Sequence, residues 1–541
     1  MDPVTLARWQ FGITTVYHFL FVPITIGLVW LVAVMQTKWY RTGDLGWLRL
    51  TKFFGKLFLI NFTAGVVTGI VQEFQFGMNW SEYSRFVGDI FGAPLALEAL
   101  IAFFLESTFI GLWIFGWERL PKRIHLATIY LVAVGSSVSA IFILAANSWM
   151  QNPIGATYRN GRAELTNFGD LFTNPFFIAT LPHTLAAAFI TAGGLVCGVA
   201  GWWMAKSVKE RTETIVTEPQ TEQHPGEELA NELAANLIGV DVEATANKSA
   251  RRAFYAPTDD TRDVNDRKTW RAATRLGAWV MVVAAIFVMG SGHYMAQTEA
   301  RLQPMKLAAS EGHFETQTGA PFSIVAIFTA DGTELVWSLD VPYVLSILAF
   351  NDPHAEVLGI VDLQEIYSTE GFQQYDGSRN DIQEEFAHQL DNVRDNTNFV
   401  PNVWVSYYSF RLMMGLGLGA AAIGAFVLFV TRGNRKVQPS KAWTALMISL
   451  PLLPLAANSF GWILTEMGRQ PWIVNGVLLT QSSVSATVAP WEILTSMILF
   501  TLVYGIIAVI VVSLFLKQIQ KGLVELAKPT PEDASVVYFA Y

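Results

Sequence analysis

The sequence predicts an all-α, polytopic membrane protein with about nine transmembrane helices, an outside N-terminus and a cytoplasmic C-terminus. Three observations support this class. Hydrophobic residues make up 52% of the 541 residues and charged residues 15%, whereas soluble domains usually carry roughly 25% charged residues. The chain also contains nine apolar runs of the ~18 to 25 residues that a ~30 Å hydrocarbon core requires. Finally, basic residues are unequally distributed among the connections between these runs.

The apolar runs define the spans in chain order. They cover residues 11–35, 56–76, 94–117, 125–146, 178–205, 274–292, 401–430, 443–467 and 488–516. Residues 1–206 therefore hold the first five helices, 274–292 the sixth, and 401–541 the last three with a cytoplasmic tail. The stretch "VPYVLSILAF" at 341–350 is too short to span a bilayer.

The orientation follows from the positive-inside rule. With the N-terminus outside, the cytoplasmic connections hold most basic residues near the span ends: Lys38, Arg41, Arg49, Lys52, Lys56, Arg119, Lys122, Arg123, Arg432, Arg435, Lys436, Lys441, Lys517, Lys521 and Lys528. The short external connections hold only Arg85, Arg159, Arg162 and Arg469. An odd number of spans then puts the C-terminus in the cytoplasm.

Two long hydrophilic segments interrupt the spans. Residues 207–273, cytoplasmic in this topology, contain the polar run "TDDTRDVNDRK" and are typical of a flexible, solvated linker. Residues 293–400, external, include apolar pieces such as "FSIVAIF", so part of this loop is expected to fold against the membrane domain. A loop of this length is more often functional than idle. The net charge of −9 arises mostly from these loops and implies no nucleic-acid partner.

The single cysteine, Cys197, restricts the cofactors that the chain can bind. One cysteine excludes an internal disulfide, a Cys-ligated iron–sulfur cluster and a structural zinc site of the thiolate type. Any cofactor must therefore be held by histidine, methionine or carboxylate side chains.

Two carboxylates, Glu98 and Glu106, interrupt the apolar stretch "GAPLALEALIAFFLESTFIGLWIFGW". Each costs about 2.5 to 3.5 kcal/mol near the centre of a spanning helix, which indicates a function. In an α-helix they would project within about 80° of each other, about 12 Å apart in depth, as a proton relay to a buried reaction centre requires. Five other polar residues could extend this path, although small residues are expected at helix contacts anyway: Lys56, Ser136, Ser137, Ser139 and Asn147.

Five helices bring potential iron ligands to one layer near the external ends of the spans. These residues are His18, Glu98, His183, Met413 and Glu466. Taken alone, each histidine is equally typical of a hydrogen-bonded core residue. Together they form an iron-type ligand set, in which a His/Met pair is a familiar axial set for low-spin haem.

Arginines, tryptophans and a glycine run accompany this layer. Arg411 and Arg469 suit anionic haem propionates, although interfacial snorkelling would also explain them. An aromatic belt would explain the nearby tryptophans, Trp149, Trp404, Trp462 and Trp472. The run "GLGLGA" at 415–420 lies inside a span without a preceding strand, which favours close helix packing over nucleotide binding.

Five stretches together resemble subunit I of the cytochrome bd-type quinol oxidases. They are "RWQFGITTVYHFLFVP", "GAPLALEALIAFFLESTFIG", "SFRLMMGLG", "EMGRQPW" and "MKLAASEGHFETQ". The resemblance covers nearly all of the membrane part. Relative to this family, segment 207–273 is longer than expected, and the external loop is intermediate between the short and long forms.

The resemblance implies two haem b groups, one low-spin and one high-spin, and one haem d. His183 and Met413 would be the axial ligands of the low-spin haem b, with Arg411 beside it. His18 and Glu466 would serve the two other haems, in either assignment, with Glu98 next to that pair. Arg469 and Trp462, from the same stretch as Glu466, are expected at the haem site. Glu106 would belong to the proton path from the cytoplasm.

Lys306 and Glu311 match the external quinol-binding loop of the family. A carboxylate and a lysine near the headgroup suit the proton transfers that quinol oxidation requires. Without the resemblance, a solvated face of an amphipathic helix would be the preferred interpretation. The sequence leaves open whether the quinol is menaquinol or ubiquinol.

The resemblance thus implies a terminal oxidase subunit in the bacterial cytoplasmic membrane. It would oxidise membrane quinol at the outer face, reduce O2 to water at the high-spin haem pair, and generate proton motive force by charge separation without pumping. A second multi-helix subunit and a small single-helix subunit would be its partners in the lipid bilayer. The alternative is a secondary transporter or ion channel with cation-binding glutamates; an outer polar layer disfavours it, because transporter sites usually lie at the bilayer midplane.

Overall fold

The computed structural model describes residues 2–217, 259–387, 397–433, 435 and 437–523. Within this part of the chain, nine helical segments are long and apolar enough to cross a membrane. Each corresponds to one of the nine predicted runs, so the predicted number of spans is confirmed. The single-helix spans are α3 (Leu45–Met78), α6 (Lys122–Gln151), α8 (Pro175–Thr217), α11 (Asp259–Leu302), α17 (Val403–Val430), α18 (Lys441–Met467) and α19 (Pro490–Lys521).

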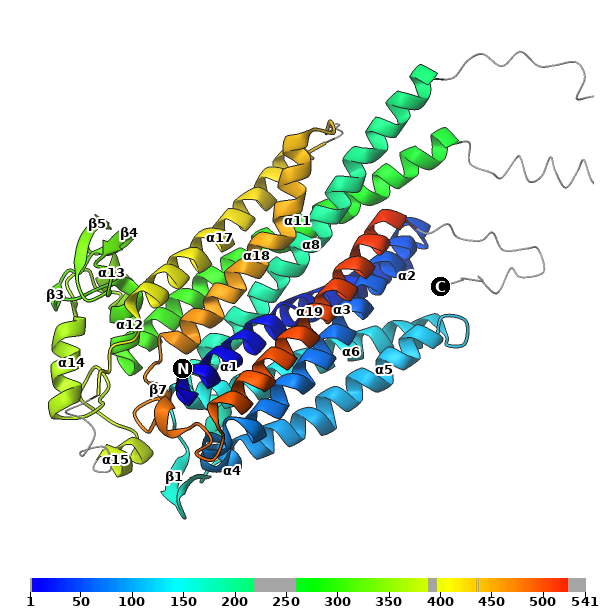
Figure 1. Cartoon of the computed structure of the whole chain (residues 1–541). Helices are drawn as coiled ribbons and strands as arrows, with labels where there is room; N and C mark the ends of the chain where they lie inside the picture. The colour runs from blue at the N-terminus through cyan, green and yellow to red at the C-terminus, as the bar shows by residue number, and fades with distance from the viewer. Residues whose placement is uncertain (1, 218–258, 388–396, 434, 436, 524–541) are drawn as a thin grey trace, which may run out of the picture.

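The spanning helices form one elongated bundle (Figure 1). The N-terminus and the elements between α11 and α17 lie at the same end of this bundle, which we call the loop end. The connection from α5 to α6 and the described ends of α8 and α11 nearest residues 218–258 lie at the opposite end. The described parts of α8 and α11 reach into both ends of the predicted linker 207–273, and the rest of that linker, 218–258, lies outside the described residues.

The first span consists of two helices, because the helical hydrogen bonding is interrupted at Leu20 and Phe21, just after His18. Helix α1 (Pro3–Phe19) ends there and α2 (Val22–Thr42) begins with Pro23 in its first turn. Proline has no backbone N–H to continue the α1 ladder. The Phe21 amide instead donates to the His18 carbonyl at 3.0 Å. His18 consequently lies in the last turn of α1.

The third span contains a π-helical turn at its first carboxylate. Helix α4 (Ser81–Leu97) is followed by the π-helix η1 (Glu98–Phe103) and by α5 (Phe104–Phe115). Glu98 and Glu106 are therefore not joined by the regular α-helix that was assumed for their predicted angle and depth. Single π-turns inside α-helices often occur at functional sites.

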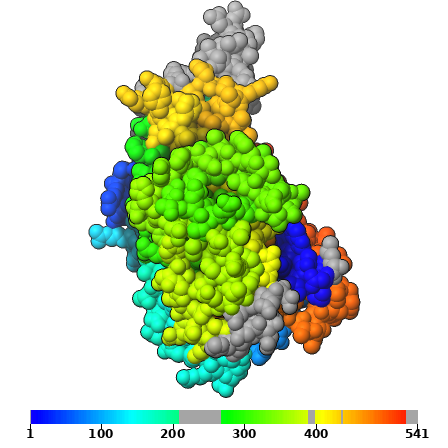
Figure 2. Space-filling view, turned by 90° about the vertical axis from the view of Figure 1, so that its left-hand side faces the viewer, coloured from blue at the N-terminus to red at the C-terminus, as the bar shows by residue number. Residues whose placement is uncertain are grey.

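The segment between α11 and α17 is folded and covers the loop end (Figure 2). It contains α12 (Pro304–Glu311), α13 (Val344–Phe350), α14 (Ile360–Thr369), α15 (Asp381–Ala387) and two antiparallel pairs, β3 (Gln317–Thr318) with β6 (Glu356–Val357) and β4 (Phe322–Phe328) with β5 (Leu335–Val341). Tyr408 of α17 donates to the Ala326 carbonyl of β4 at 2.7 Å. The expected packing of this loop against the membrane domain is confirmed.

Shorter elements complete the loop end. They are the hairpin of β1 (Ala156–Arg159) and β2 (Arg162–Leu165), α7 (Asp170–Thr173), the pair of β7 (Trp472–Val474) and β8 (Leu478–Leu479), and the 3₁₀ turn η2 (Thr480–Ser482).

Two local interpretations of the sequence are wrong. The glycines of "GLGLGA", Gly415, Gly417 and Gly419, do not mediate close packing, because a Cβ at each would face open space among the described residues. Trp149 and Trp472 are buried inside the protein and do not form a lipid-facing belt.

Helices α8 and α11 approach each other most closely at Gly193 and Gly277. A Cβ on Gly277 would lie 2.5 Å from the Gly193 carbonyl oxygen and 2.6 Å from the Cys197 backbone nitrogen. Small residues allow membrane helices to come into such backbone contact. The fully buried Cys197 is part of this contact and has a packing role.

We expect Gly277→Ala to lower the stability of the purified protein by about 1 to 3 kcal/mol, because the added methyl group would overlap the α8 backbone. Thermal unfolding in detergent measures the change. Gly505→Ala is the matched control, since a Cβ at Gly505 meets no described atom and alanine is the better helix former. Equal unfolding temperatures for the two variants would contradict the close contact.

Candidate functional site

Two of the predicted carboxylates lie side by side along α6. The Ser139 hydroxyl donates to Glu98 Oε1 at 2.5 Å. One helical turn before Ser139, Gly135 faces Glu106, whose Cγ would lie only 2.8 Å from a Cβ at that position. A separation of four residues along α6 corresponds to about 6 Å. The α6 helix therefore holds Glu106 and Glu98 in a row that runs toward the loop end.

Glu466, at the end of α18, continues this row. Asn147 Nδ2 on α6 donates to Glu466 Oε1 at 3.2 Å. Eight residues separate Asn147 from Ser139, which is about 12 Å along the helix. Two of the small polar residues expected on a proton path, Ser139 and Asn147, thus contact carboxylates directly.

Arg469 is buried beside Glu466. Its Nη2 lies 2.5 Å from Glu466 Oε2, and its side chain is 1% exposed. Its Nε and Nη1 have no hydrogen-bond partner among the described residues. Snorkelling is therefore the wrong explanation for Arg469. A buried guanidinium with two free donors is suited to an additional anionic ligand, because unsatisfied buried donors are costly.

His18 has the tautomer of a metal ligand. Its Nδ1 lies 2.9 Å from Thr68 Oγ1 on α3. The Thr68 hydroxyl is placed to donate to the Ala64 carbonyl at 2.9 Å, which favours a proton on His18 Nδ1. His18 Nε2 then carries a lone pair and has no hydrogen-bond partner among the described residues. A metal-binding imidazole is typically oriented in this way through its other nitrogen.

His183, on α8, repeats this arrangement. Its Nδ1 lies 3.2 Å from Ser291 Oγ on α11, and the Ser291 hydroxyl donates to the Phe287 carbonyl at 2.7 Å. The proton again belongs on Nδ1, which leaves Nε2 as an acceptor without a partner in the described chain. The two histidines therefore present the same free nitrogen from two separate helices.

A glycine on a neighbouring helix lies beside three of the four candidate ligands. A Cβ at Gly69 would lie 3.2 Å from His18 Cε1, and one at Gly292 would lie 3.3 Å from His183 Cε1. Gly461 of α18 faces Met413 of α17, with a Cβ 3.0 Å from Met413 Sδ. The absence of a side chain at each glycine lets the candidate ligand pack directly against the neighbouring helix.

Trp462 connects this region to α1. Its ring packs edge-on against Phe19, the residue after His18, with ring centroids 5.0 Å apart. The candidate ligands themselves are spread singly, and no three His, Cys, Asp or Glu side chains of the described residues meet as a metal-binding group. The lone pairs of the two histidines and the unpartnered Arg469 nitrogens fit haem groups, which take one or two axial ligands from the protein.

The short helix α12 is buried over its whole length, so the solvated-face interpretation of its charged residues is wrong. Glu311, at its end, lies 2.6 Å from Arg411 Nη2. Burial raises the pKa of Glu311, and the neighbouring Arg411 opposes this shift. Arg411 Nε also donates to the Ser323 carbonyl at 2.7 Å, and its Nη1 has no partner in the described chain.

Lys306, in the first turn of α12, forms a second buried ion pair. Its Nζ lies 2.7 Å from Glu299 Oε1 on α11, with side-chain exposures of 4% and 12% respectively. Sequence reasoning missed Glu299. It lies on a different helix from Lys306, and no spacing rule relates the two positions.

Glu73 on α3 is a second residue that sequence reasoning missed. It lies in the apolar span formed by α3, close enough to Glu98 for the two carboxyl groups to interact. The signal was available, because an ionisable residue inside an apolar run is the same feature that selected Glu98 and Glu106.

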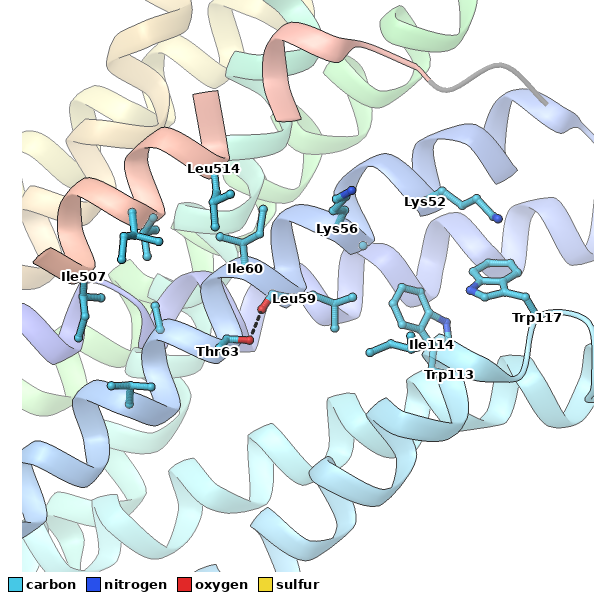
Figure 3. A pocket seen from close by; sticks show the side chains of 15 residues that line it. Lys52, Lys56, Leu59, Ile60, Thr63, Trp113, Ile114, Trp117, Ile507 and Leu514 are labelled. Carbon is cyan, nitrogen blue, oxygen red and sulfur yellow. Dashed lines mark hydrogen bonds between the residues drawn. The ribbon is translucent and has the colours of Figure 1, made fainter. Parts of the chain in front are cut away.

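A cavity of about 440 Å³ lies between α3, α5 and α19, toward the end of the bundle opposite the loop end (Figure 3). Lys52 and Lys56 lie along it with Trp113 and Trp117, and aliphatic side chains form most of its remaining wall. Glu106 is not among the lining residues.

Known proteins are similar to this chain over most of its length. The family model described as cytochrome bd terminal oxidase subunit I matches residues 6–221 and 249–523. Cytochrome bd ubiquinol oxidase subunit 1 of Bacillus subtilis (strain 168) is 39% identical over 96% of this chain and 94% of its own. Cytochrome bd-II ubiquinol oxidase subunit 1 of Escherichia coli (strain K12) is 34% identical over 90% of each chain.

A solved structure agrees at the level of the fold. The bd oxidase from Geobacillus thermodenitrificans aligns with a TM-score of 0.74 at 24% identity, over 96% of this chain and 99% of the compared chain. The internal gap in the family match, residues 222–248, lies in segment 207–273, the segment noted as longer than expected. On the extent of these matches, the chain belongs to the cytochrome bd terminal oxidase subunit I family.

Proposed function

We propose that this chain is the haem-bearing catalytic subunit of a terminal oxidase in the bacterial cytoplasmic membrane. It oxidises membrane quinol at the loop end and reduces O2 to water at a high-spin haem pair. The observation that carries the proposal is the buried Glu311–Arg411 ion pair. It links α12, which carries the proposed quinol-binding residues, to α17, which carries Met413 two residues after Arg411.

The side chains described above would hold the haem groups. His183 and Met413 hold a low-spin haem b, and His18 and Glu466 hold a high-spin haem b and a haem d. Arg411 and Arg469 supply donors for propionates, and both have unpartnered nitrogens in the described chain. When bound, these groups supply one-electron transfer and the binding and reduction of O2.

Quinol oxidation releases two electrons and two protons, so the quinol site needs proton acceptors. Glu311 is suited to take a hydroxyl proton, because burial favours its protonated form while Arg411 keeps the ionised form accessible. Lys306 is suited to donate a hydrogen bond to a quinol oxygen and to stabilise negative charge there. These protons leave at the loop end, which the positive-inside rule places outside.

The protons consumed in forming water follow the carboxylate row along α6. Glu106 receives them from the opposite end of the bundle, and Glu98 passes them toward Glu466. Charge separates because protons are released on one side and taken up from the other, without a pump. A second multi-helix subunit and a small single-helix subunit complete the enzyme.

We expect His183→Ala and Met413→Leu each to remove the low-spin haem b signal, because each removes one axial ligand. Reduced-minus-oxidised visible spectra of the purified enzyme measure this signal. The exposed His354 provides the control variant, His354→Ala. If both ligand variants keep the signal unchanged, the ligand assignment is wrong.

We expect Glu311→Gln to slow quinol-driven O2 consumption by about 100-fold, since the amide keeps a hydrogen bond to Arg411 but cannot accept a proton. Oxygen uptake with decylubiquinol measures the rate. The control is Glu365→Gln, at an exposed glutamate of the same loop. A Glu311→Gln enzyme as fast as this control would remove Glu311 from the proton-transfer step.

We expect Glu106→Gln to slow O2 reduction at least ten-fold by blocking proton supply, with the low-spin haem spectrum unchanged. Glu106→Asp, which keeps a protonatable group, should retain more activity. The measurement is the rate at which the fully reduced enzyme reoxidises with O2. Equal rates for the two variants would argue against a proton-carrying role.

A further inference from the structure

The Lys306 ammonium is only partly used by the protein. An ammonium carries three hydrogen-bond donors, and among the described residues only Glu299 pairs with Nζ, at 2.7 Å. The side chain is 4% exposed, so water does not freely satisfy the remaining donors. Two N–H groups are therefore available to a ligand oxygen in a buried place.

Contacts other than this ion pair also hold the backbone of α12. Gln303, just before the helix, donates through Nε2 to the Gln151 carbonyl at 2.6 Å. Glu311, at the other end, is held by Arg411 at 2.6 Å. The Glu299 carboxylate is thus one of several contacts that hold α12, whereas among the described residues it is the ion-pair partner of Lys306 and sets the direction of the ammonium.

The surroundings of Lys306 restrict the aliphatic part of its side chain, called its stem below. Gly468 lies under the stem, and a Cβ there would be 3.1 Å from Lys306 Cγ. Glu299 comes from α11, a long helix packed against α8. A carboxylate on a rigid helix thus determines where the charged end of a lysine from a second helix lies.

We propose that Glu299 is a positioning residue of the quinol site. It holds the Lys306 ammonium in a fixed direction, so that the two remaining N–H groups meet an oxygen of a para-quinol headgroup. This inference rests on the proposed quinol-binding role of Lys306 and Glu311. Glu299 itself does not touch the quinol and takes no proton from it. Removing its charge leaves a buried ammonium without a counterion, which then turns away from this position.

The test uses the complete, membrane-extracted oxidase with Glu299→Gln. We expect the KM for decylubiquinol to rise about ten-fold while kcat stays within about two-fold. The Kd for heptyl-hydroxyquinoline N-oxide, a redox-inactive headgroup analogue followed by its fluorescence quenching, should rise by the same factor. Glu365→Gln is the control, and haem spectra verify assembly. Glu299→Asp keeps the charge and should recover most of the affinity. If Glu299→Gln does not assemble, Glu299→Asp serves as the test in its place. A KM for Glu299→Asp more than about ten-fold above the wild-type value would then overturn the proposal.

A double-mutant cycle separates the possible failures. If Glu299 acts through Lys306, adding Glu299→Gln to Lys306→Met causes no further loss of affinity. Additive losses, or an unchanged KM and Kd in Glu299→Gln, would overturn the positioning role while Lys306→Met still weakens binding. If Lys306→Met and Glu311→Gln both leave quinol binding and turnover unchanged, the quinol site itself is misplaced.

Discussion

The structure depends on the pairing of charged side chains inside an apolar bundle. An unpaired charge in such surroundings is costly, so each buried cation here has a carboxylate beside it from another element or another turn. Arg411 pairs with Glu311, Lys306 with Glu299, and Arg469 with Glu466. These pairs join α12 to α11 and α17 and stabilise the last turn of α18. The same contacts that permit burial therefore also fix the geometry of the proposed quinol and haem sites.

The two histidines show how the bundle prepares a ligand. In each case a hydroxyl on the neighbouring helix lies within hydrogen-bond distance of a carbonyl of its own helix, Thr68 with Ala64 and Ser291 with Phe287. This arrangement favours acceptance of a hydrogen bond from Nδ1. The tautomer and the ring direction follow from that one constraint. Helix α1 ends just after His18, so the His18 ring lies in its last turn and contacts Thr68 of α3. The protein thus needs only one hydroxyl and one glycine per ligand to leave Nε2 free.

Helix α6 gives the site its direction. It contacts Glu106, Glu98 and Glu466 through Gly135, Ser139 and Asn147 in turn. Because these contacts come from one continuous helix, the spacing of the carboxylates is set by its rise, even though the π-turn at Glu98 disturbs the helix that carries two of them. The proposed supply and release of protons then occur at opposite ends of a single bundle, which is the geometric requirement for charge separation without a pump.

The sequence by itself determined the number of spans, because hydropathy is a local property that a bilayer-length window measures directly. It also singled out Glu98 and Glu106, since a carboxylate in an apolar run is anomalous wherever the helix packs. Only the tertiary structure decided which groups meet: Thr68 behind His18, 50 residues away, Ser291 behind His183, 108 residues away, and Glu299 beside Lys306. It also decided that a π-helical turn begins at Glu98, and that no described atom would contact a Cβ at Gly415. These features depend on how separate helices turn and cross, which packing sets and local composition does not encode.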